Sequence, residues 1–329
     1  MRLMKLCYFL SSFFVVAILM SSCKDNPTTN ENFTVTLTTV ANLKPLTSAE
    51  GHYELWISFP EETRALNKPG HGDQAYVSFG KFNVNANNQL VDLSGNAKSS
   101  FTPGANAQVD INLAVDALIT VELSGDNNDE PGSRMLGGLF FGTDRQATAI
   151  LKSDGEDVFD FDYTRSSGSY ILMTPSTADT SDANHGIWWM TANNAAGLSN
   201  LPTLTDTSGW RYEGWVADQS GAQPIFYSTG KFLNAAGPDA DGPGATAGSG
   251  AGFAFPGQDF IQAANGVPLL PALDNGNFAA RITLEPAPDN SAQPFQLVIL
   301  NEDKLETAGG TMENRVTANF PTATIMISR

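Results

Sequence analysis

A glutamate and a tryptophan recur in the same short context at two places in this 329-residue chain. The first context reads Tyr-Glu-Leu-Trp-Ile over residues 53–57, and the second reads Tyr-Glu-Gly-Trp-Val over residues 212–216. In an extended strand the Glu and the Trp share one face, so the carboxylate lies beside a large apolar ring. A half-buried carboxylate needs a partner that compensates its charge, and ion pairing is therefore the first chemistry to look for.

A lysine follows each pentapeptide in a second repeated context. Lys81 lies within Ser-Phe-Gly-Lys-Phe and Lys231 lies within Ser-Thr-Gly-Lys-Phe. Turn-forming residues separate each lysine strand from its pentapeptide, which favours antiparallel pairing. We therefore predict an ion pair between Glu54 and Lys81. The same pairing is predicted between Glu213 and Lys231, where it would fix register more than stability.

A third matched block carries a further glutamate in each half. Ile-Thr-Val-Glu-Leu spans residues 119–123 and Ile-Thr-Leu-Glu-Pro spans residues 282–286. Matched blocks in the same order at nearly constant spacing indicate an internal duplication. The residues that we expect to play equivalent structural parts in the two copies are Tyr53, Glu54, Trp56, Lys81 and Glu122, and Tyr212, Glu213, Trp215, Lys231 and Glu285.

The blocks that carry these residues have the two-residue period of β-strands. Apolar and polar residues alternate over 33–37, 109–115 and 278–284, and Gly, Pro and Asn turns lie between such runs. No convincing amphipathic helix of twelve residues is apparent. We therefore predict an all-β protein of two tandem antiparallel β-sandwich domains.

The matched blocks also set the expected domain boundaries. We predict a first β-sandwich repeat over 33–152, a linker with an extra hairpin over 153–186, and a second repeat over 187–329. Each repeat is expected to close with a β-rich run, at 147–151 in the first copy and at 323–327 in the second.

The first 23 residues have the pattern of an export signal. Two basic residues precede an apolar run over 6–20, which is too short for a comfortable membrane span. Met20-Ser21-Ser22-Cys23 resembles the lipobox of bacterial lipoproteins, and Cys23 is the only cysteine outside the apolar segment. We predict a lipoprotein signal over 1–23, lipidation of Cys23 and a polar tether over 24–32.

The charge balance limits the partners of the exported part. Residues 24–329 hold all 35 acidic residues but only 16 of the 18 basic ones, since Arg2 and Lys5 lie in the signal. Such an acidic surface argues against nucleic acid and anionic lipid as partners. We expect attachment to the membrane through the N-terminal lipid, in the bacterial cell envelope at the outer membrane. The alternatives are its periplasmic face and the cell surface, and Lys24-Asp25-Asn26 resembles a surface-export tag.

Catalytic and metal-binding patterns are scarce. The three histidines, His52, His71 and His185, are far apart, and no zinc spacing or nucleophile-elbow pattern occurs. Acidic residues are plentiful, but no carboxylate pair is singled out by its context for sugar hydrolysis. We therefore expect no enzymatic activity and no cofactor.

Calcium is the ion that the sequence suits best. Asp239-Ala240-Asp241-Gly242 looks like the start of a calcium loop, although the remaining oxygen ligands and the terminal Glu are missing. The simpler interpretation, which we favour, is a solvated acidic loop within the low-complexity stretch 235–252.

Three tryptophans outside the pentapeptides offer a different activity. Trp188 and Trp189 are adjacent on an expected strand, so that their side chains point to opposite faces, and Trp210 precedes a strand. The outward rings are either covered by the linker hairpin or exposed as a glycan-binding surface.

These blocks together resemble the extracytoplasmic domain of anti-sigma-K-type factors. That β-sandwich has a Tyr-x-Leu-Trp strand, a Ser-x-Gly-x-Phe strand and a Thr-x-Glu-Pro segment. The matching positions are Tyr53, Leu55, Trp56, Gly80 and Phe82, and Tyr212, Trp215, Gly230, Phe232, Thr283, Glu285 and Pro286. The resemblance implies the fold and a sensing or partner-binding role, with no catalytic residues.

Sigma-factor inhibition is not implied, because the cytoplasmic domain and transmembrane helix of those factors have no counterpart here. We therefore expect a lipid-anchored cell-envelope protein with a non-catalytic interaction, sensing or structural role and a protein partner. The alternative is a carbohydrate-binding surface lipoprotein whose partner is a glycan.

Overall fold

The structure is a computed structural model, which describes residues 33–60, 74–105, 107, 109–126, 128–143, 145–155, 157–289 and 291–329. The predicted signal over 1–23, the lipidation site Cys23, the tether over 24–32 and His71 lie outside these residues. No helix in the described ranges is long and apolar enough to cross a bilayer.

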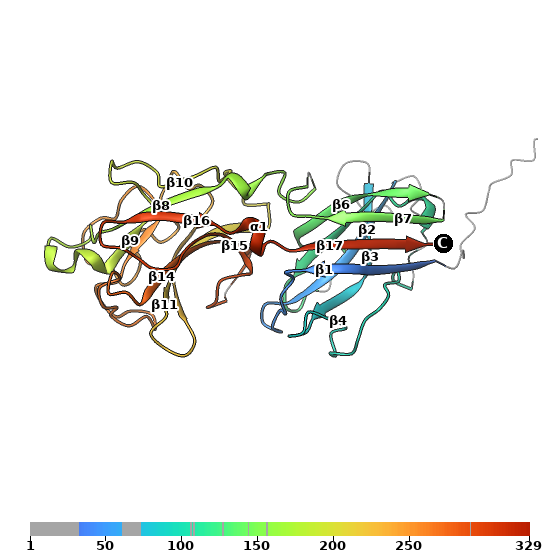
Figure 1. Cartoon of the computed structure of the whole chain (residues 1–329), viewed down its shortest axis with the longest axis horizontal. Helices are drawn as coiled ribbons and strands as arrows, with labels where there is room; N and C mark the ends of the chain where they lie inside the picture. The colour runs from blue at the N-terminus through green and yellow to red at the C-terminus, as the bar shows by residue number, and fades with distance from the viewer. Residues whose placement is uncertain are drawn as a thin grey trace, which may run out of the picture.

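The chain is all-β, as predicted, and forms two antiparallel sandwich domains (Figure 1). The strands are β1 (Thr34–Ala41), β2 (His52–Pro60), β3 (Gln74–Val84), β4 (Leu90–Val91), β5 (Asp116–Glu122), β6 (Ser133–Thr143), β7 (Gln146–Leu151), β8 (Ser167–Leu172), β9 (Gly186–Trp188), β10 (Leu198–Ser199), β11 (Trp210–Asp218), β12 (Ile225–Phe232), β13 (Gly257–Asp259), β14 (Phe278–Pro286), β15 (Leu297–Glu302), β16 (Gly310–Asn314) and β17 (Thr322–Ser328). The helical elements are η2 (Ile111–Leu113), η3 (Tyr163–Arg165), η4 (Thr180–His185) and α1 (Val316–Asn319).

The first domain contains a strand from the far end of the sequence. Its strand order is β1-β17-β7-β6-β5-β2-β3-β4. β17 is antiparallel to β1 on one side and to β7 on the other, with Ile325 opposite Leu37 and Ala149. The prediction that residues 323–327 close the second repeat is therefore wrong.

The second domain repeats this order when it is read in reverse, apart from β4 and β13, which have no counterparts. A strand from the other copy occupies the matching place. The order in the second domain is β12-β11-β14-β15-β16-β8-β9-β13, with β10 beside β8. β8 lies between β9 and β16, as β17 lies between β1 and β7. The segment over 153–186 is thus not a separate linker with its own hairpin, because β8 belongs to the second sheet.

The two copies therefore exchange their last strands. β8 follows β7 in the first copy and β17 follows β16 in the second, and each completes the sheet of the other copy. The exchange follows from hydrogen bonding, since a strand inserted between two others satisfies backbone groups on both of its edges. Alternation within one strand carries no information about which sheet receives it.

One predicted strand is displaced. Residues 109–115 alternate like a strand, but Asp110 accepts a hydrogen bond from the Asn112 amide and begins the short turn η2. This local side-chain bond competes with the extended backbone, and the strand begins only at Asp116.

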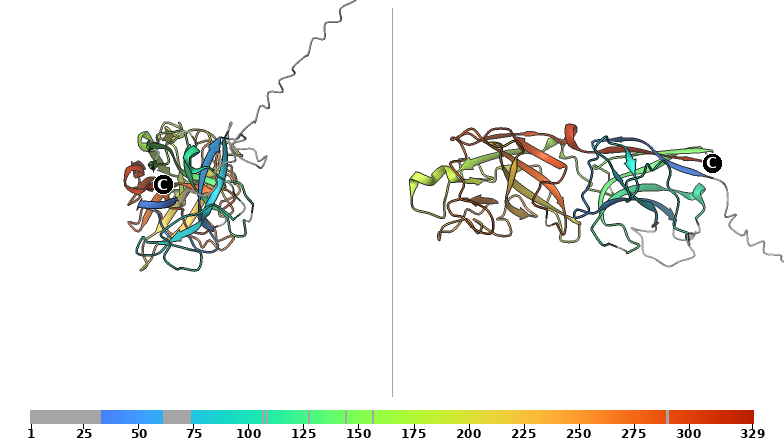
Figure 2. Two further views of the ribbon diagram at one scale, coloured as in Figure 1. Left: turned by 90° about the vertical axis from the view of Figure 1, so that its right-hand side faces the viewer. Right: turned by 90° about the horizontal axis from the view of Figure 1, so that it is seen from below.

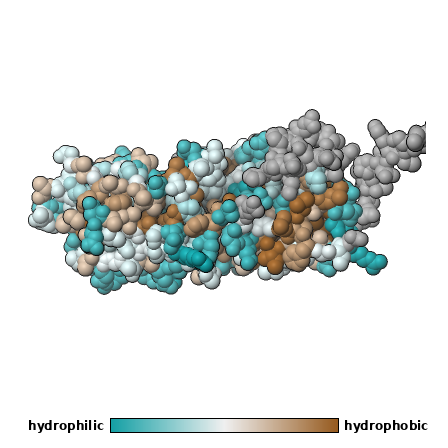
Figure 3. Space-filling view, turned by 90° about the horizontal axis from the view of Figure 1, so that it is seen from above, coloured by the Kyte–Doolittle hydropathy of each residue, from teal (hydrophilic) through white to brown (hydrophobic). Residues whose placement is uncertain are grey.

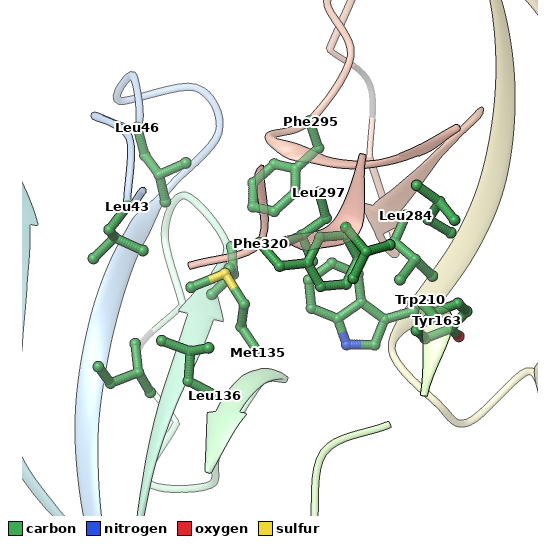
Figure 4. Packing of buried hydrophobic residues seen from close by; sticks show 14 of the residues in the cluster. Leu43, Leu46, Met135, Leu136, Tyr163, Trp210, Leu284, Phe295, Leu297 and Phe320 are labelled. Carbon is green, nitrogen blue, oxygen red and sulfur yellow. The ribbon is translucent and has the colours of Figure 1, made fainter. Parts of the chain in front are cut away.

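One large apolar cluster runs through both domains and across their junction (Figure 4), and a small cluster of Trp56, Tyr76 and Leu118 is separate from it. Leu43 and Met135 of the first domain face Trp210 and Phe295 of the second in this view. Polar contacts lock the same junction, because Gln296 donates to the Tyr53 hydroxyl at 2.5 Å and accepts from the Lys44 amide at 2.8 Å. The domains are thus joined by packing as well as by the exchanged strands.

The domains lie end to end, which both side views show (Figures 1 and 2). Thr34 at the start of β1 is paired with Ser328 at the end of β17, so the first described strand begins and the last one ends at the far end of the first domain. A tether attached before β1 would hold the molecule by that end.

Shortening the side chain of Ile325 tests the strand exchange. Ile325 is fully buried, so Ile325→Ala should lower the free energy of unfolding by about 2–4 kcal/mol in urea titrations. Met326→Ala, on the opposite face of the same strand, should cost less than about 1 kcal/mol. Hydrogen exchange of the Ile325→Ala variant should accelerate in β1 and β7 before β15 and β16. Faster exchange confined to β16 would contradict the assignment of β17 to the first domain.

Candidate functional site

The predicted Glu213–Lys231 ion pair forms on the outer face of the second sheet. The Lys231 Nζ atom lies 3.6 Å from Glu213 Oε2, and Ser228 Oγ donates to Glu213 Oε1 at 2.5 Å. Lys231 also donates to Asp289, at 2.7 Å to its carbonyl oxygen and at 3.0 Å to Oδ2. One lysine therefore serves two carboxylates, and the prediction is confirmed.

The tryptophan of the pentapeptide extends this cluster to the neighbouring strand. Trp215 Nε1 donates to Thr283 Oγ1 at 2.9 Å, and the Thr283 hydroxyl donates to Glu285 Oε1. The Phe295 amide donates to both oxygens of Glu285, at 2.9 and 3.0 Å. A chain of hydrogen bonds thus runs from the indole to a buried carboxyl group.

The first domain repeats this chain residue for residue. Trp56 Nε1 donates to Thr120 Oγ1 at 2.9 Å, and Thr120 donates to Glu122. The Gly132 amide takes the part of Phe295 and donates to Glu122 Oε1 at 2.9 Å.

The lysine side of the cluster also repeats. Glu54 and Lys81 are directly opposite in the register of β2 and β3, and Ser78 Oγ donates to Glu54 Oε1. The contacts of the described residues include no ion pair between Glu54 and Lys81, so that pair stays a prediction. Lys81 Nζ donates to the Asp126 carbonyl at 3.0 Å. We call each such group an acid network: Ser78, Lys81, Glu54, Trp56, Thr120, Glu122 and Asp126 in the first domain, and Ser228, Lys231, Glu213, Trp215, Thr283, Glu285 and Asp289 in the second.

A glycine with an unusual backbone makes each network possible. Gly80 has φ of +121° and Gly230 has φ of +98°, which side chains rarely tolerate. Each lies beside a register shift in its hairpin, and its amide donates to the Ser78 or Ser228 hydroxyl at 3.2 or 3.1 Å. These bulges turn the serine toward the glutamate and explain the glycine in both lysine segments.

Burial dominates the electrostatics of the networks. Glu213 is 3% exposed and Glu285 is 1% exposed. Burial raises the pKa of Glu213 from its ordinary value of 4.5 to about 7, although Ser228 and Lys231 oppose the shift. Burial raises the pKa of Glu285 well above its ordinary value, and the charge of Glu213 adds to the rise. These carboxyls are therefore stabilised in their protonated form near neutral pH.

The second network also has the spacing of a cation site. One oxygen each from Glu213, Glu285 and Asp289 lies within 4.8 Å of the other two. The Lys231 ammonium already lies among them, at the distances given above, and supplies the positive charge. Lys231 is thus paired with two of the three acids, and a metal ion would have to displace it.

Each network borders a cavity at the domain junction. A cavity of about 540 Å³ is lined by Glu122 and Asp126 together with Gly209 of the second domain. Another of about 470 Å³ is lined by Glu285 and Asp289 together with Glu50 of the first domain. The networks therefore lie where one domain contacts the other.

The tryptophans predicted as a ligand surface are buried. Trp188, Trp189 and Trp210 are each at most 1% exposed. Trp188 Nε1 donates to Asp259 at 2.9 Å, while Trp210 Nε1 donates to the Arg134 carbonyl at 3.0 Å across the junction. The loop after β12 covers Trp188, and the main core holds the other two. None of the three can stack on a sugar at the surface.

The weak calcium candidates do come together. Asp239 and Asp241 both lie against Gly230, where an added Cβ atom would stand 2.6 Å from Asp239 Cγ and from Asp241 Oδ1. Asp239 is buried, in contrast to the solvated loop that the sequence favours.

Sequence reasoning missed the hydroxyl groups of the networks. Ser78, Thr120, Ser228 and Thr283 connect the acids to the indoles and glycines. Their signal was available in the matched blocks, because each threonine lies two residues before Glu122 or Glu285 and each serine lies three residues before Lys81 or Lys231.

Comparison with protein-family models, with curated proteins and with solved structures gave no match to this chain.

The raised pKa values predict a protein that is more stable in mild acid. Between pH 4.5 and about 7 folded Glu213 holds a proton that the unfolded chain releases, so the free energy of unfolding falls as the pH rises through that window. We expect unfolding in urea to cost on the order of 2 kcal/mol more at pH 5 than at pH 7.5.

The variant Glu285→Gln tests the source of this pH dependence. Glutamine imitates the protonated carboxyl and keeps the acceptor for Thr283, so the variant should remain folded at pH 7 with a shallower pH slope. Glu306→Gln, at an exposed side chain, should leave the slope unchanged. An identical slope in the wild type and both variants would contradict a contribution from the acid network.

Proposed function

We propose that the protein is a lipid-anchored cell-envelope protein with a non-catalytic interaction or structural role. The observation that carries this proposal is an apolar patch on the first domain. Leu139 and Phe141 of β6 and Ile150 of β7 are 66%, 59% and 50% exposed. A broad apolar area is visible on that domain from above (Figure 3). Contiguous apolar surface of this kind is typical of an interaction site.

The surroundings of the patch suit a protein partner. Gln146 and Thr148 on β7 and Lys152 beyond it place polar side chains around the apolar ones, and an apolar centre with a polar rim is typical of protein interfaces. The patch lies on β6 and β7, and the turn that joins these strands lies beside Ser328, which is paired with Thr34 at the start of β1. An anchored protein would therefore present it close to the membrane.

The burial of the tryptophans supports this reading over the glycan-binding alternative, which depended on an exposed aromatic row. The acid networks support a structural role, because their carboxyl groups are buried and are held by the hydroxyl, amide and lysine partners of their own domain. The lipid anchor at Cys23, the outer-membrane location and the resemblance to anti-sigma-K-type domains stay predictions from the sequence.

Photo-crosslinking in cells tests the proposal. A photoreactive amino acid at position 141 of the tagged protein should form one discrete protein adduct. The same residue at position 93, where Leu93 is 56% exposed in a separate turn, should form none. Cys23→Ser should abolish the adduct at position 141, because the unanchored protein loses its location.

A discrete adduct from position 141 that requires Ile150, and so is lost in Ile150→Ser, would support an interaction through the patch. Equal labelling at positions 141 and 93, or no adduct at either, would contradict it. An adduct that persists in Cys23→Ser would contradict the lipid anchor while leaving the patch as the interaction site.

A further inference from the structure

The loop after β12 holds two carboxylates against one glycine. The Ala240 amide donates to the Lys231 carbonyl at 2.9 Å and fastens the loop to the strand. The Gly244 amide donates to the Asp241 carbonyl at 3.1 Å and closes a turn through Gly242, whose φ is +60°. This backbone holds Asp239 and Asp241 on the same side of the loop, both beside Gly230.

Two buried oxygens in this region accept no hydrogen bond from the described residues. Asp239 Oδ2 accepts from the Gly257 amide at 2.7 Å, but Asp239 Oδ1 has no donor. Gln258, the residue after Gly257, donates through Nε2 to Thr246 at 2.8 Å, while its Oε1 has no donor. The Gln258 amide lies against Gly244 in the same turn, where an added Cβ would stand 1.9 Å from Oε1.

Burying these two oxygens without a hydrogen-bond donor costs free energy. Asp239 is 8% exposed and Gln258 is 5% exposed, and buried polar atoms are normally paired. Both atoms are pure acceptors, so the group that satisfies them must carry positive charge or a donated hydrogen. Residues 232–280 contain no lysine or arginine that could supply it from within this part of the chain.

The first domain differs at the equivalent place. Beside Gly80, which matches Gly230, the nearest group is the Lys98 ammonium, 3.6 Å from the position of an added Cβ. The first copy thus carries its own cation there, whereas the second carries two carboxylates. We propose that Asp239, Asp241 and Gln258 of the second domain bind a divalent cation. Their carboxylate and amide oxygens suit calcium best, with backbone carbonyls and water completing the shell.

Terbium luminescence provides the test, because Tb³⁺ occupies oxygen-rich calcium sites and is excited through nearby tryptophan. Trp188 packs against Gly257, the residue that binds Asp239, and is the expected donor. The full-length protein in detergent should bind one Tb³⁺ that calcium displaces. Asp239→Asn and Asp241→Asn should each weaken binding tenfold or more. Asp179→Asn, at an exposed aspartate elsewhere in the second domain, should leave it unchanged.

Thermal unfolding controls for the fold of the variants. Calcium should raise the Tm of the wild type by several degrees but not that of the Asp239→Asn, Asp241→Asn double variant, which should unfold cooperatively without calcium. Absence of Tb³⁺ binding in the wild type would overturn the proposal. So would binding that survives in the double variant and is lost in Asp289→Asn, because the ion would then lie in the acid network.

Discussion

β17 lies between β1 and β7, and neither domain is complete without a strand from the other copy. The backbone groups of an edge strand must find partners, and here the partners arrive from the opposite end of the sequence. β8 makes the same connection in the reverse direction. The end-to-end arrangement, the continuous core and the position of both chain ends all follow from this exchange.

The acid network is the part of the duplicated domain that both copies share. Both copies retain the Trp, the two Glu, the Lys, the bulge Gly and the hydroxyl groups that join them. A buried carboxyl with a raised pKa costs stability at neutral pH, and the hydrogen bonds and ion pairs of the network offset part of that cost and fix one register. The loops that pack beside the bulges have diverged, with Lys98 in one copy and Asp239 in the other. The shared part is structural, whereas the diverged part is where the copies can differ in binding.

Much of this could be predicted from the sequence, for identifiable reasons. The two-residue period located β1 and β14, and the repeated blocks located β2 and placed Glu213 opposite Lys231. Strand order could not be predicted, because alternation in residues 323–327 is equally compatible with either sheet. The exposure of Trp188 could not be predicted either, since it depends on a glycine-rich loop that folds back over the ring. Gln258 could not be predicted from the sequence as a ligand, because its proposed role depends on a turn formed about fifteen residues earlier in the chain.

The exchange also has a consequence for how the molecule is made. During synthesis the chain emerges from its N-terminus, so β1 to β7 are made long before β17. Until then the facing edges of β1 and β7 stay open, a state that invites aggregation or proteolysis. The first domain can therefore complete its sheet only after almost the whole chain has been made. A chain that is cut anywhere before β17 lacks the strand that lies between β1 and β7. Its first domain, although made first, then cannot complete its sheet.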